Sequence, residues 1–389
     1  MSAPEIRFPE FKEPWRPTVA GAAFKHSRAR GEAGLPIYSV TLDRGMVRRD
    51  SLDRHMESDA ADGQNLRAQP GDVVYNMMRM WQGAVGVAPE ECMVSPAYVV
   101  LRPTKGTNPR FFSYWFQNSR MLHKLGAYSH GLTKDRLRLY PDDFAKIPLN
   151  LPSRAEQDRI AAFFEGIDAK LAALREKADG LRQFKTGLMQ RLFSQELRFT
   201  RDDGTDFPDW EEKKFGDVFV ERSQRGNPIG ELLSVTLRSG IRKASEVDRA
   251  QEASSDRSNY KIVCCGDIAY NSMRMWQGAS GLSNYDGIVS PAYTVMAFRG
   301  DHCGKFWSYL LKNPEVINLF RRYSQGLTSD TWNLKFPILS RIRIKIPSVD
   351  EQKKISSALI AVDSKIDAVT DQITHMETFK KGLLQKMFV

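Results

Sequence analysis

One stretch of this sequence occurs twice. Residues 71–86 are GDVVYNMMRMWQGAVG and residues 266–281 are GDIAYNSMRMWQGASG, which places the two copies 195 positions apart. The same offset continues downstream, because Val94-Ser95-Pro96-Ala97-Tyr98 recurs as Val289-Ser290-Pro291-Ala292-Tyr293. Solenoid and propeller repeats have periods of roughly 20–50 residues, so a unit of this length must hold its own hydrophobic core. The sequence therefore predicts two homologous globular domains.

Each copy has the pattern of a domain built from both strands and helices. In the first copy, short β-rich runs such as residues 37–42 and 73–75 alternate with Gly, Pro and Asp turns, and one helix is expected near residues 110–122. The second copy repeats this pattern up to Ile346, with residues 232–237 in place of the first of those strands. We predict an α+β (mixed α/β) fold class for both copies.

A helix start follows each predicted domain. Pro152-Ser153-Arg154-Ala155-Glu156 and Pro347-Ser348-Val349-Asp350-Glu351 both have the capping-box pattern, in which the Ser and Glu side chains satisfy free amides of the first helical turn. A long helix is expected after each. The predicted boundaries are 1–152 and 196–346 for the globular domains, with helical regions at 153–195 and 347–389.

Apolar residues in both helical regions follow a heptad pattern, which breaks at Lys185 and at the equivalent Lys380. One interpretation is an amphipathic helix lying on its own domain, but the length of the pattern favours a coiled coil of the two helices. Few residues separate Phe193 from Phe207, so antiparallel packing needs no long linker. We expect two domains separated by two long antiparallel coiled-coil helices, with a pseudo-two-fold internal repeat. The seam residues expected are Ile160, Ile167, Leu171, Leu174 and Leu181 in the first helix, and Ile355, Val362, Ile366, Val369 and Met376 in the second.

The charge of the chain favours an anionic partner. The formal net charge is +10 and the pI is about 9.3, a balance that is typical of nucleic-acid-binding proteins but also occurs on surfaces that bind nothing acidic. The first residues contain no basic segment that leads into an apolar run, and no apolar run approaches the roughly 18 residues that a membrane span needs. A cytoplasmic protein without membrane association is therefore expected.

No catalytic or metal site is recognisable. The four cysteines include no Cys-x-x-Cys pair and the six histidines are scattered. Ser-Pro-Ala-Tyr, at 95–98 and 290–293, resembles the signature of amino-methyltransferases, but no glycine-rich loop for S-adenosylmethionine precedes either copy. A nuclease pattern formed by Pro141-Asp142 and Asp168-Ala169-Lys170 is incomplete in the second copy and is treated as a chance match. We expect no catalytic residues and no metal ligands.

A polar and aromatic cluster within the duplicated stretch is suited to a nucleic-acid surface, where Arg meets phosphate and amides meet base edges. The alternative is that Trp and Met fill the core while Arg79 and Arg274 pair with acidic side chains such as Asp72 and Asp267. The candidate residues are Asn76, Arg79 and Gln82, beside Trp81, and Asn271, Arg274 and Gln277, beside Trp276.

The two copies differ inside loops that otherwise match, for example around the shared Gly-Leu-Thr. If both copies contact DNA, shared residues can bind the backbone while divergent residues recognise different bases. The alternative is that these charged residues form an ordinary solvated surface. The candidates are Arg44, Arg48, His130, Lys134 and Arg136 in the first copy, and Arg242, Lys243, Gln325, Thr331 and Asn333 in the second.

Taken together, the chain resembles the specificity subunit of type I restriction-modification enzymes over essentially its whole length. The resemblance depends on the duplicated stretch, the Ser-Pro-Ala-Tyr and Gly-Leu-Thr motifs, the Pro-Ser-x-x-Glu-Gln helix starts, and the Phe-Lys-(Thr/Lys)-Gly-Leu helix ends. It implies two target-recognition domains that each recognise half of a bipartite, asymmetric site in double-stranded DNA. It also implies helices that set the spacing and dock modification subunits, two of them per chain, with restriction subunits in the full complex. No cofactor is then expected in this chain, because S-adenosylmethionine, ATP and Mg would bind the partner subunits.

Two other functions remain open. A DNA adenine methyltransferase with its own recognition repeats would bind S-adenosylmethionine, and a non-catalytic coiled-coil adaptor would show no salt-sensitive DNA binding. The seam from Ile160 to Leu192 would be roughly 50 Å long at 1.5 Å per residue, comparable to about 15 base pairs. The helices are therefore expected to act as a ruler between the two half-sites.

Overall fold

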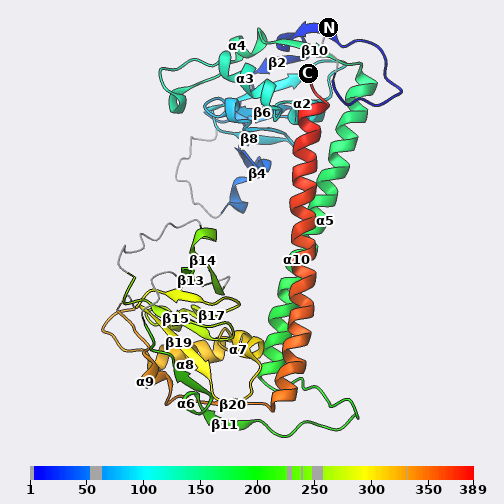
Figure 1. The fold of residues 1–389 in the computed structure, drawn as a ribbon. Helices are drawn as coiled ribbons and strands as arrows, with labels where there is room; N and C mark the ends of the chain where they lie inside the picture. Colours follow the sequence, from blue (N-terminus) through cyan, green and yellow to red (C-terminus); the bar gives the residue numbers. More distant parts are fainter. Residues whose placement is uncertain (1–3, 53–63, 226–229, 238–239, 248–256, 330) are drawn as a thin grey trace. The chain divides into compact units, whose positions relative to one another are not determined.

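The structure, a computed structural model, describes residues 4–52, 64–225, 230–237, 240–247, 257–329 and 331–389. The chain forms two compact units, the first made of Met1–Glu176 together with Val369–Val389, and the second of Lys177–Ala368. Both ends of the chain thus belong to the first unit, where the Ile6 amide donates to the Lys386 carbonyl at 3.1 Å. Figure 1 shows the C-terminal end of the last helix beside strands of this unit.

The first unit is built around two four-stranded sheets with separate cores. One sheet has the order β2-β9-β6-β7 and is antiparallel throughout, and the other has the order β4-β3-β8-β5, in which β3 and β8 are parallel. A further antiparallel pair, β1-β10, leads to the long helix. The strands are β1 (Arg16–Val19), β2 (Phe24–Ser27), β3 (Ile37–Thr41), β4 (Gly45–Arg48), β5 (Leu66–Ala68), β6 (Val73–Asn76), β7 (Val85–Val87), β8 (Cys92–Val94), β9 (Tyr98–Pro103) and β10 (Pro148–Leu151).

The helix expected near residues 110–122 is two helices, so that prediction was wrong. Helix α2 (Pro109–Trp115) ends at Trp115. A second helix, α3 (Ser119–Ala127), begins directly after Asn118. The Asn118 side chain accepts hydrogen bonds from two amides of α3, at 2.9 and 3.2 Å, and so caps a new helix. Its amide nitrogen donates to the Leu384 carbonyl at 2.6 Å, which fixes the break against the end of the chain. The other short helices of this unit are α1 (Ala20–Ala23) and α4 (Pro141–Ala145).

The second unit repeats the first in its element order. Its main sheet has the order β12-β19-β16-β17, equivalent to β2-β9-β6-β7. The predicted internal repeat is thus confirmed at the level of topology. The strands are β11 (Glu211–Lys214), β12 (Phe219–Glu221), β13 (Leu233–Thr236), β14 (Gly240–Lys243), β15 (Lys261–Val263), β16 (Ile268–Asn271), β17 (Ser280–Leu282), β18 (Gly287–Val289), β19 (Tyr293–Phe298) and β20 (Arg343–Ile346), and the short helices are α6 (Phe215–Val218), α7 (Gly304–Leu310), α8 (Pro314–Tyr323) and α9 (Phe336–Leu339).

The long helices α5 (Arg154–Phe193) and α10 (Val349–Lys386) pack against each other in antiparallel orientation (Figure 1). In the first unit Arg175 pairs with Glu377 at 2.6 Å, and in the second Lys185 pairs with Asp363 at 2.6 Å. The predicted α+β class with an antiparallel helix pair is confirmed. Most seam residues are buried, namely Ile160, Ile167, Leu171, Leu174, Ile355, Val362 and Val369, whereas Leu181, Ile366 and Met376 are half-buried.

The two lysines that break the heptad pattern occupy equivalent networks. Lys380 donates to Asp168 at 2.6 Å, and the Tyr114 hydroxyl donates to the same carboxylate at 2.8 Å. The second unit has the same arrangement of Lys185, Tyr309 and Asp363. If the two helices were shifted along each other, this lysine and aspartate would lie in the apolar seam without a partner, which would destabilise the shifted arrangement. The pair therefore fixes the alignment of the two helices. Asp168 therefore has a structural role.

The predicted capping boxes are half formed. The Glu156 amide donates to the Ser153 hydroxyl oxygen at 3.3 Å, as the pattern predicts. The Glu156 carboxylate instead accepts hydrogen bonds from Arg7, at 2.7 Å for both contacts, and from Trp15 at 3.2 Å. A guanidinium presents two donors to a carboxylate and forms a stronger pair than a single amide does, so the carboxylate turns away from the helix start. Among the described residues, no helix is long and apolar enough to cross a membrane.

Candidate nucleic-acid interface

The most strongly repeated motif forms a tight turn after β6 in the first unit and after β16 in the second. The Asn76 side-chain oxygen accepts from the Met78 amide at 2.9 Å, and the Trp81 indole donates to the Met78 carbonyl at 3.1 Å. Gly83 closes the turn with φ of 93°, a conformation that favours glycine. We call residues 76–83 the β6 turn and the equivalent residues 271–278 the β16 turn, in which Asn271 and Trp276 make the same bonds at 3.0 Å.

Each turn divides its side chains between core and surface. Met80 is completely buried, whereas Arg79 and Gln82 are exposed. The core alternative is therefore right for the methionine. The proposed pairing of Arg79 with Asp72 is wrong, because the buried Asp72 is paired with Arg102 at 3.5 Å. Among the described residues, no carboxylate pairs with Arg79.

The β16 turn repeats this division. Met275 is completely buried and Arg274 is exposed, while Gln277 is half-buried and lies 3.4 Å from the Arg274 guanidinium. Asp267, the predicted partner of Arg274, is bound by Arg222 at 2.7 Å instead. In both units the arginine of the turn is thus exposed, and no described carboxylate pairs with it.

The Gly-Leu-Thr segments form closed loops beside these turns. In the first GLT loop (residues 130–138), His130 and Arg138 form a pair of backbone hydrogen bonds at 2.9 Å, and the following Leu139 amide donates to the Met77 carbonyl at 2.9 Å. The second GLT loop (residues 325–333, of which 330 is not described) is closed by Gln325 and Asn333. It is attached to the β16 turn through the amide of Leu334 and the carbonyl of Ser272, at 2.8 Å. The structure therefore brings each turn together with one GLT loop.

The two GLT loops differ in their electrostatics. In the first, His130, Lys134 and Arg136 are exposed, and the His130 ring nitrogen lies 3.1 Å from Asp143. A hydrogen bond from Lys146 to Asp143, together with the nearby His130, lowers the pKa of this carboxyl from its usual range. The first loop thus presents more cations than anions, since Asp135 is its one exposed carboxylate.

The second GLT loop presents uncharged polar groups at the same positions. Gln325 and Thr331 are exposed, and the Thr331 hydroxyl donates to the Thr328 carbonyl at 2.9 Å. The side-chain oxygen of Asn333 is buried and has no hydrogen-bond partner among the described residues. Two cations that sequence reasoning missed, Arg321 and Arg322, lie exposed in the last turn of α8, just before this loop. A basic pair so close to the Gly-Leu-Thr motif was the available signal.

The remaining candidates lie on another hairpin in each unit. Arg44 and Arg48 are exposed on the β3–β4 hairpin and lie near Asp43 at 3.7 Å and Asp50 at 3.8 Å. In the second unit Arg242 is exposed on β14, and Lys243 lies 3.9 Å from Glu231. These hairpins are separate elements from the turns and the GLT loops. The candidates thus form two groups in each unit.

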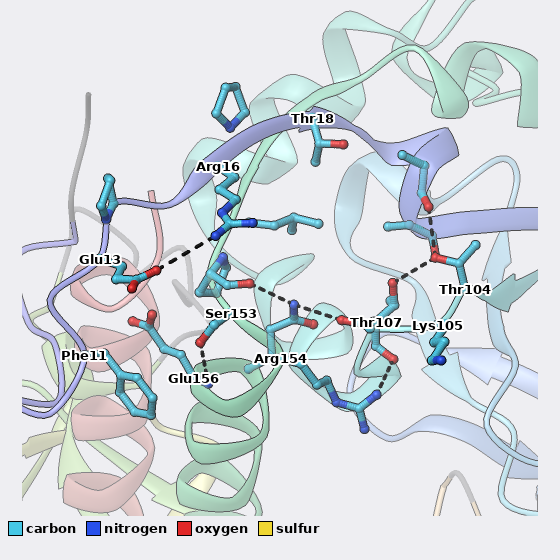
Figure 2. A pocket seen from close by; sticks show the side chains of 18 of the residues that line it. Phe11, Glu13, Arg16, Thr18, Thr104, Lys105, Thr107, Ser153, Arg154 and Glu156 are labelled. Atoms are coloured by element: carbon cyan, nitrogen blue, oxygen red, sulfur yellow. Dashed lines mark hydrogen bonds and ion pairs between the residues drawn. The ribbon is translucent and has the colours of Figure 1, made fainter.

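An open pocket of about 770 Å³ lies where the N-terminal segment meets the start of α5 (Figure 2). Its lining includes both charge signs, such as Arg16 beside Glu13 at 3.9 Å. Its most buried carboxylate, Glu156, is already satisfied by Arg7 and Trp15. The pocket therefore holds no free buried charge that would bind a ligand.

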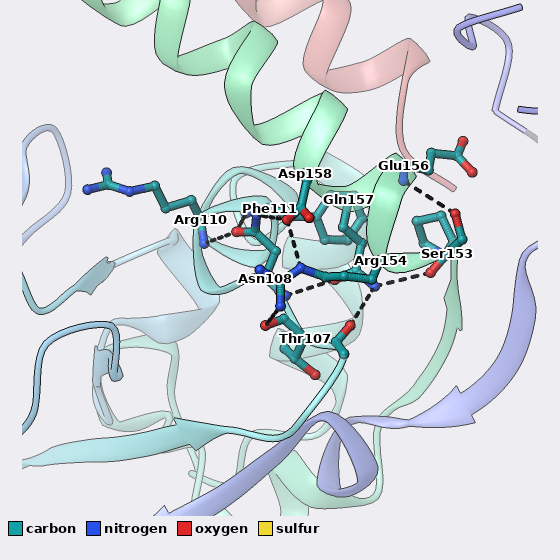
Figure 3. A network of polar contacts seen from close by, with 11 residues as sticks. Thr107, Asn108, Arg110, Phe111, Ser153, Arg154, Glu156, Gln157 and Asp158 are labelled. Carbon is teal, nitrogen blue, oxygen red and sulfur yellow. Dashed lines mark hydrogen bonds and ion pairs between the residues drawn. The ribbon is translucent and has the colours of Figure 1, made fainter. Parts of the chain in front are cut away.

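Beside this pocket, a polar network joins α5 to the loop before α2 (Figure 3). The buried Gln157 accepts from the Asn108 amide at 2.9 Å and donates to the Pro152 carbonyl at 3.1 Å. Gln352 makes the equivalent bonds in the second unit, to the Cys303 amide and the Pro347 carbonyl. The shared Glu-Gln of the helix starts thus joins each long helix to its domain. Among the described residues, no group of three or more His, Cys, Asp or Glu could hold a metal ion.

Comparison with known proteins identifies relatives of this chain. Residues 20–182 match the family model described as the type I restriction modification DNA specificity domain. The putative type I restriction enzyme MjaX specificity subunit of Methanocaldococcus jannaschii is 21% identical over 214 residues, which cover 50% of this chain and 49% of that protein. The chain thus matches about half the length of this curated relative.

Three solved structures share the fold. A chain from a study of complex assembly and conformational transition of the type I R-M system has a TM-score of 0.58 at 16% identity, covering 97% of this chain and 98% of its own. The type I restriction-modification S subunit from M. genitalium has a TM-score of 0.56 at 12% identity, with coverage of 100% and 99%. The HsdS subunit from Thermoanaerobacter tengcongensis has a TM-score of 0.51 at 15% identity, with coverage of 97% of both chains. Residues 20–182 thus match the model of the type I restriction modification DNA specificity domain, and the described chain shares the fold of these S-subunit structures.

Proposed function

We propose that this chain recognises a bipartite DNA sequence within a type I restriction-modification assembly and that each unit recognises one half of the site. The observation that carries the proposal is the match of residues 20–182 to a DNA specificity domain, together with a second unit of the same topology. The exposed arginines of the two turns support it, because sequence-independent affinity for DNA comes mainly from contacts of Lys and Arg with phosphates.

The division of labour within each unit follows from what the copies share. Arg79 and Arg274 are shared and exposed, which suits contacts with phosphates that carry no sequence information. The GLT loops differ in charge and in hydrogen-bonding groups, which suits contacts with different base edges. Asn76 and Asn271 already accept one hydrogen bond each with their side-chain oxygens within the turns, which leaves the amide nitrogen and the second lone pair of each oxygen for DNA.

Modification subunits are the proposed protein partners, and the long helices are the proposed docking surface. Phe184 on α5 and the equivalent Phe379 on α10 are 58% and 53% exposed. Large aromatic side chains in such positions are typical of the anchors of protein interfaces. Two equivalent positions suit two copies of the same partner. The same helices would set the spacing between the half-sites.

The direct test is DNA binding by the purified full chain, measured by fluorescence anisotropy on a pool of randomised duplexes at several salt concentrations. The proposal predicts binding whose affinity falls steeply as salt rises and selection of particular sequences from the pool. A non-catalytic coiled-coil adaptor would show neither the salt dependence nor the selection.

We further propose that the chain is not itself an enzyme and that S-adenosylmethionine, ATP and Mg bind its partners. The measurement is transfer of labelled methyl groups to DNA, and nicking of DNA, by rigorously purified chain with and without a modification subunit. Methyl transfer only in the presence of the partner is expected. Binding of S-adenosylmethionine or turnover by the chain alone would support the alternative, a methyltransferase with its own recognition repeats.

A further inference from the structure

The most exposed large apolar side chains among the described residues occupy equivalent positions in the two units. Leu132 is 95% exposed and Leu327 is 102% exposed, whereas the next most exposed, Phe184, reaches 58%. A single exposed leucine is ordinary on a protein surface. Two leucines at the same place in both copies, each with no described side chain covering it, call for a shared cause.

The backbone of each GLT loop holds its leucine outward. A side chain at Gly131 would place Cβ less than 3.0 Å from the Arg136 carbonyl oxygen, and one at Gly326 would lie 2.6 Å from the Thr331 carbonyl oxygen. The two ends of each loop are joined by backbone hydrogen bonds, and the Arg136 amide donates to the Thr133 carbonyl at 2.9 Å. Each loop is therefore closed and tightly packed on itself, and it cannot bury its leucine without opening.

Cations occur in or directly before both GLT loops, with one exposed carboxylate, Asp135, in the first loop. Lys134, Arg136 and Arg138 are exposed in the first GLT loop, and no described carboxylate pairs with them. Arg321 and Arg322 are exposed beside the second GLT loop. An apolar tip on a loop with several nearby cations matches a polyanion with an apolar interior, which is the chemistry of stacked bases between phosphate backbones.

The copies also indicate what the leucine does not do. The GLT loops differ at 130/325, 134/329, 136/331, 137/332 and 138/333 but share Gly-Leu-Thr. A leucine that contacted a thymine methyl in the major groove would select that base, and the two units would then require the same base. Both units have this leucine, although the residues around it in the loop differ. A shared side chain of this kind suits a contact that does not depend on the DNA sequence.

We propose that Leu132 and Leu327 insert between adjacent base pairs of the bound DNA as apolar wedges, one in each half-site. This inference rests on the proposed function, since it needs each unit to contact DNA. The cations of the loop would bind phosphates on both sides of the step. The leucine would separate two neighbouring base pairs and pack against them, which replaces part of their lost stacking contact. Apolar wedges of this kind unstack base steps and kink the duplex.

The test uses the full chain without partner proteins, so that any unstacking arises from this chain. Duplexes are first selected from a randomised pool by binding to the wild-type chain. A fluorescent base analogue is then placed at each position of a selected duplex in turn, and its emission is measured with and without protein. The wedge predicts an increase at one step in each half-site. Leu132→Ala should abolish the increase in one half-site only, Leu327→Ala in the other, and Leu132→Met should retain it.

The outcomes separate the wedge from the function on which it rests. If no sequence is enriched from the pool, the proposed DNA recognition fails. Enrichment without any unstacked step, or unstacking that survives both alanine substitutions, overturns the wedge alone. A Leu132→Ala effect on affinity that disappears when thymines are replaced by uracil would also overturn it, because the leucine would then touch a thymine methyl group. Circular dichroism of each variant verifies that the chain is folded.

Discussion

Arg79 and Arg274 are exposed at equivalent places in the β6 and β16 turns, and no described carboxylate pairs with them. If each arginine contacts a phosphate, a variant with alanine in its place should release about one counterion fewer from the DNA when it binds. Arg79→Ala and Arg274→Ala should each weaken binding to all DNA sequences and reduce the slope of log affinity against log salt by about one unit. Binding titrations over a range of salt concentrations measure this slope.

Two controls accompany this prediction. Arg79→Lys retains the charge and should retain the slope. Arg102→Ala removes an arginine that is already paired with Asp72, so its effect should be on stability and not on the slope. An unchanged slope in both alanine variants of the turns would show that neither arginine binds phosphate.

At this scale the sequence grouped residues that the structure does place in one turn, but it did not predict what each side chain contacts. The pattern placed Asn76, Arg79 and Trp81 together as one DNA-binding cluster, whereas Asn76 and Trp81 hydrogen-bond within the turn. Their role depends on the backbone closing at Gly83, which the sequence motif alone does not reveal. Leu132 was missed because a leucine in a sequence gives no sign of whether it is covered.

Glycines at two positions should respond oppositely to replacement by alanine, because one has space for a side chain and the other does not. Gly166 on α5 has nothing within 4 Å of the position of an added Cβ, and glycine within a helix costs roughly 1 kcal/mol relative to alanine. Gly166→Ala should therefore raise the free energy of unfolding by about 1 kcal/mol. Urea denaturation of the full chain, followed by far-UV circular dichroism, measures the change.

Gly86→Ala is the matched comparison. A Cβ at this position on β7 would lie 2.5 Å from the Met46 amide nitrogen of β4, so the β3–β4 hairpin would have to shift away from β7. This variant should be destabilised by about 1–3 kcal/mol, the usual cost of overpacking. Equal stability of the two variants would contradict the close packing of this hairpin on β7.

The elements were predictable where a periodic pattern is long. The heptads placed α5 and α10, and their antiparallel packing followed from chain connectivity. The break between α2 and α3 was missed because Phe111, Phe112 and Trp115 continue an apolar pattern up to Asn118, and only the capping geometry of that residue reveals a new helix. The Glu156 carboxylate was misassigned because its partner, Arg7, is distant in sequence.

Each long helix contributes residues to both compact units. A change in the length of the helices therefore tests the prediction that they set the spacing between the two half-sites. Seven residues inserted after Glu176 and seven after Ala368 would keep the heptad seam and the Lys–Asp pairs in register. They would lengthen each helix by about 10 Å, equivalent to about three base pairs. The unspecified spacer of the recognised site should lengthen by a similar amount, as determined by methylation-aware sequencing of DNA from cells that carry the complete system. An unchanged spacer in an active variant would contradict the ruler.

Exchange of one domain tests whether the two units recognise DNA independently. The first unit is not made of residues 1–152 alone, because Phe388 packs on Phe111, Trp115 and Phe164 at ring distances of 5.3 to 6.2 Å. An exchange should therefore replace residues 1–152 together with the apolar residues at the C-terminal end of α10 that contact them, or the hybrid will lose part of its core.

With this design, replacing the first domain by that of a relative with a different specificity should change one half of the recognised sequence and leave the other half intact. The physical reason is that the GLT loop and turn of the second unit pack within that unit, as in the Trp276–Trp332 ring contact at 5.2 Å. Removal of a single side chain that hydrogen-bonds a base should cost roughly 1–3 kcal/mol at one position only. Selection of duplexes from a randomised pool by the parent and the hybrid measures both halves at once. A hybrid in which both halves changed, or neither did, would show that recognition is shared between the two units.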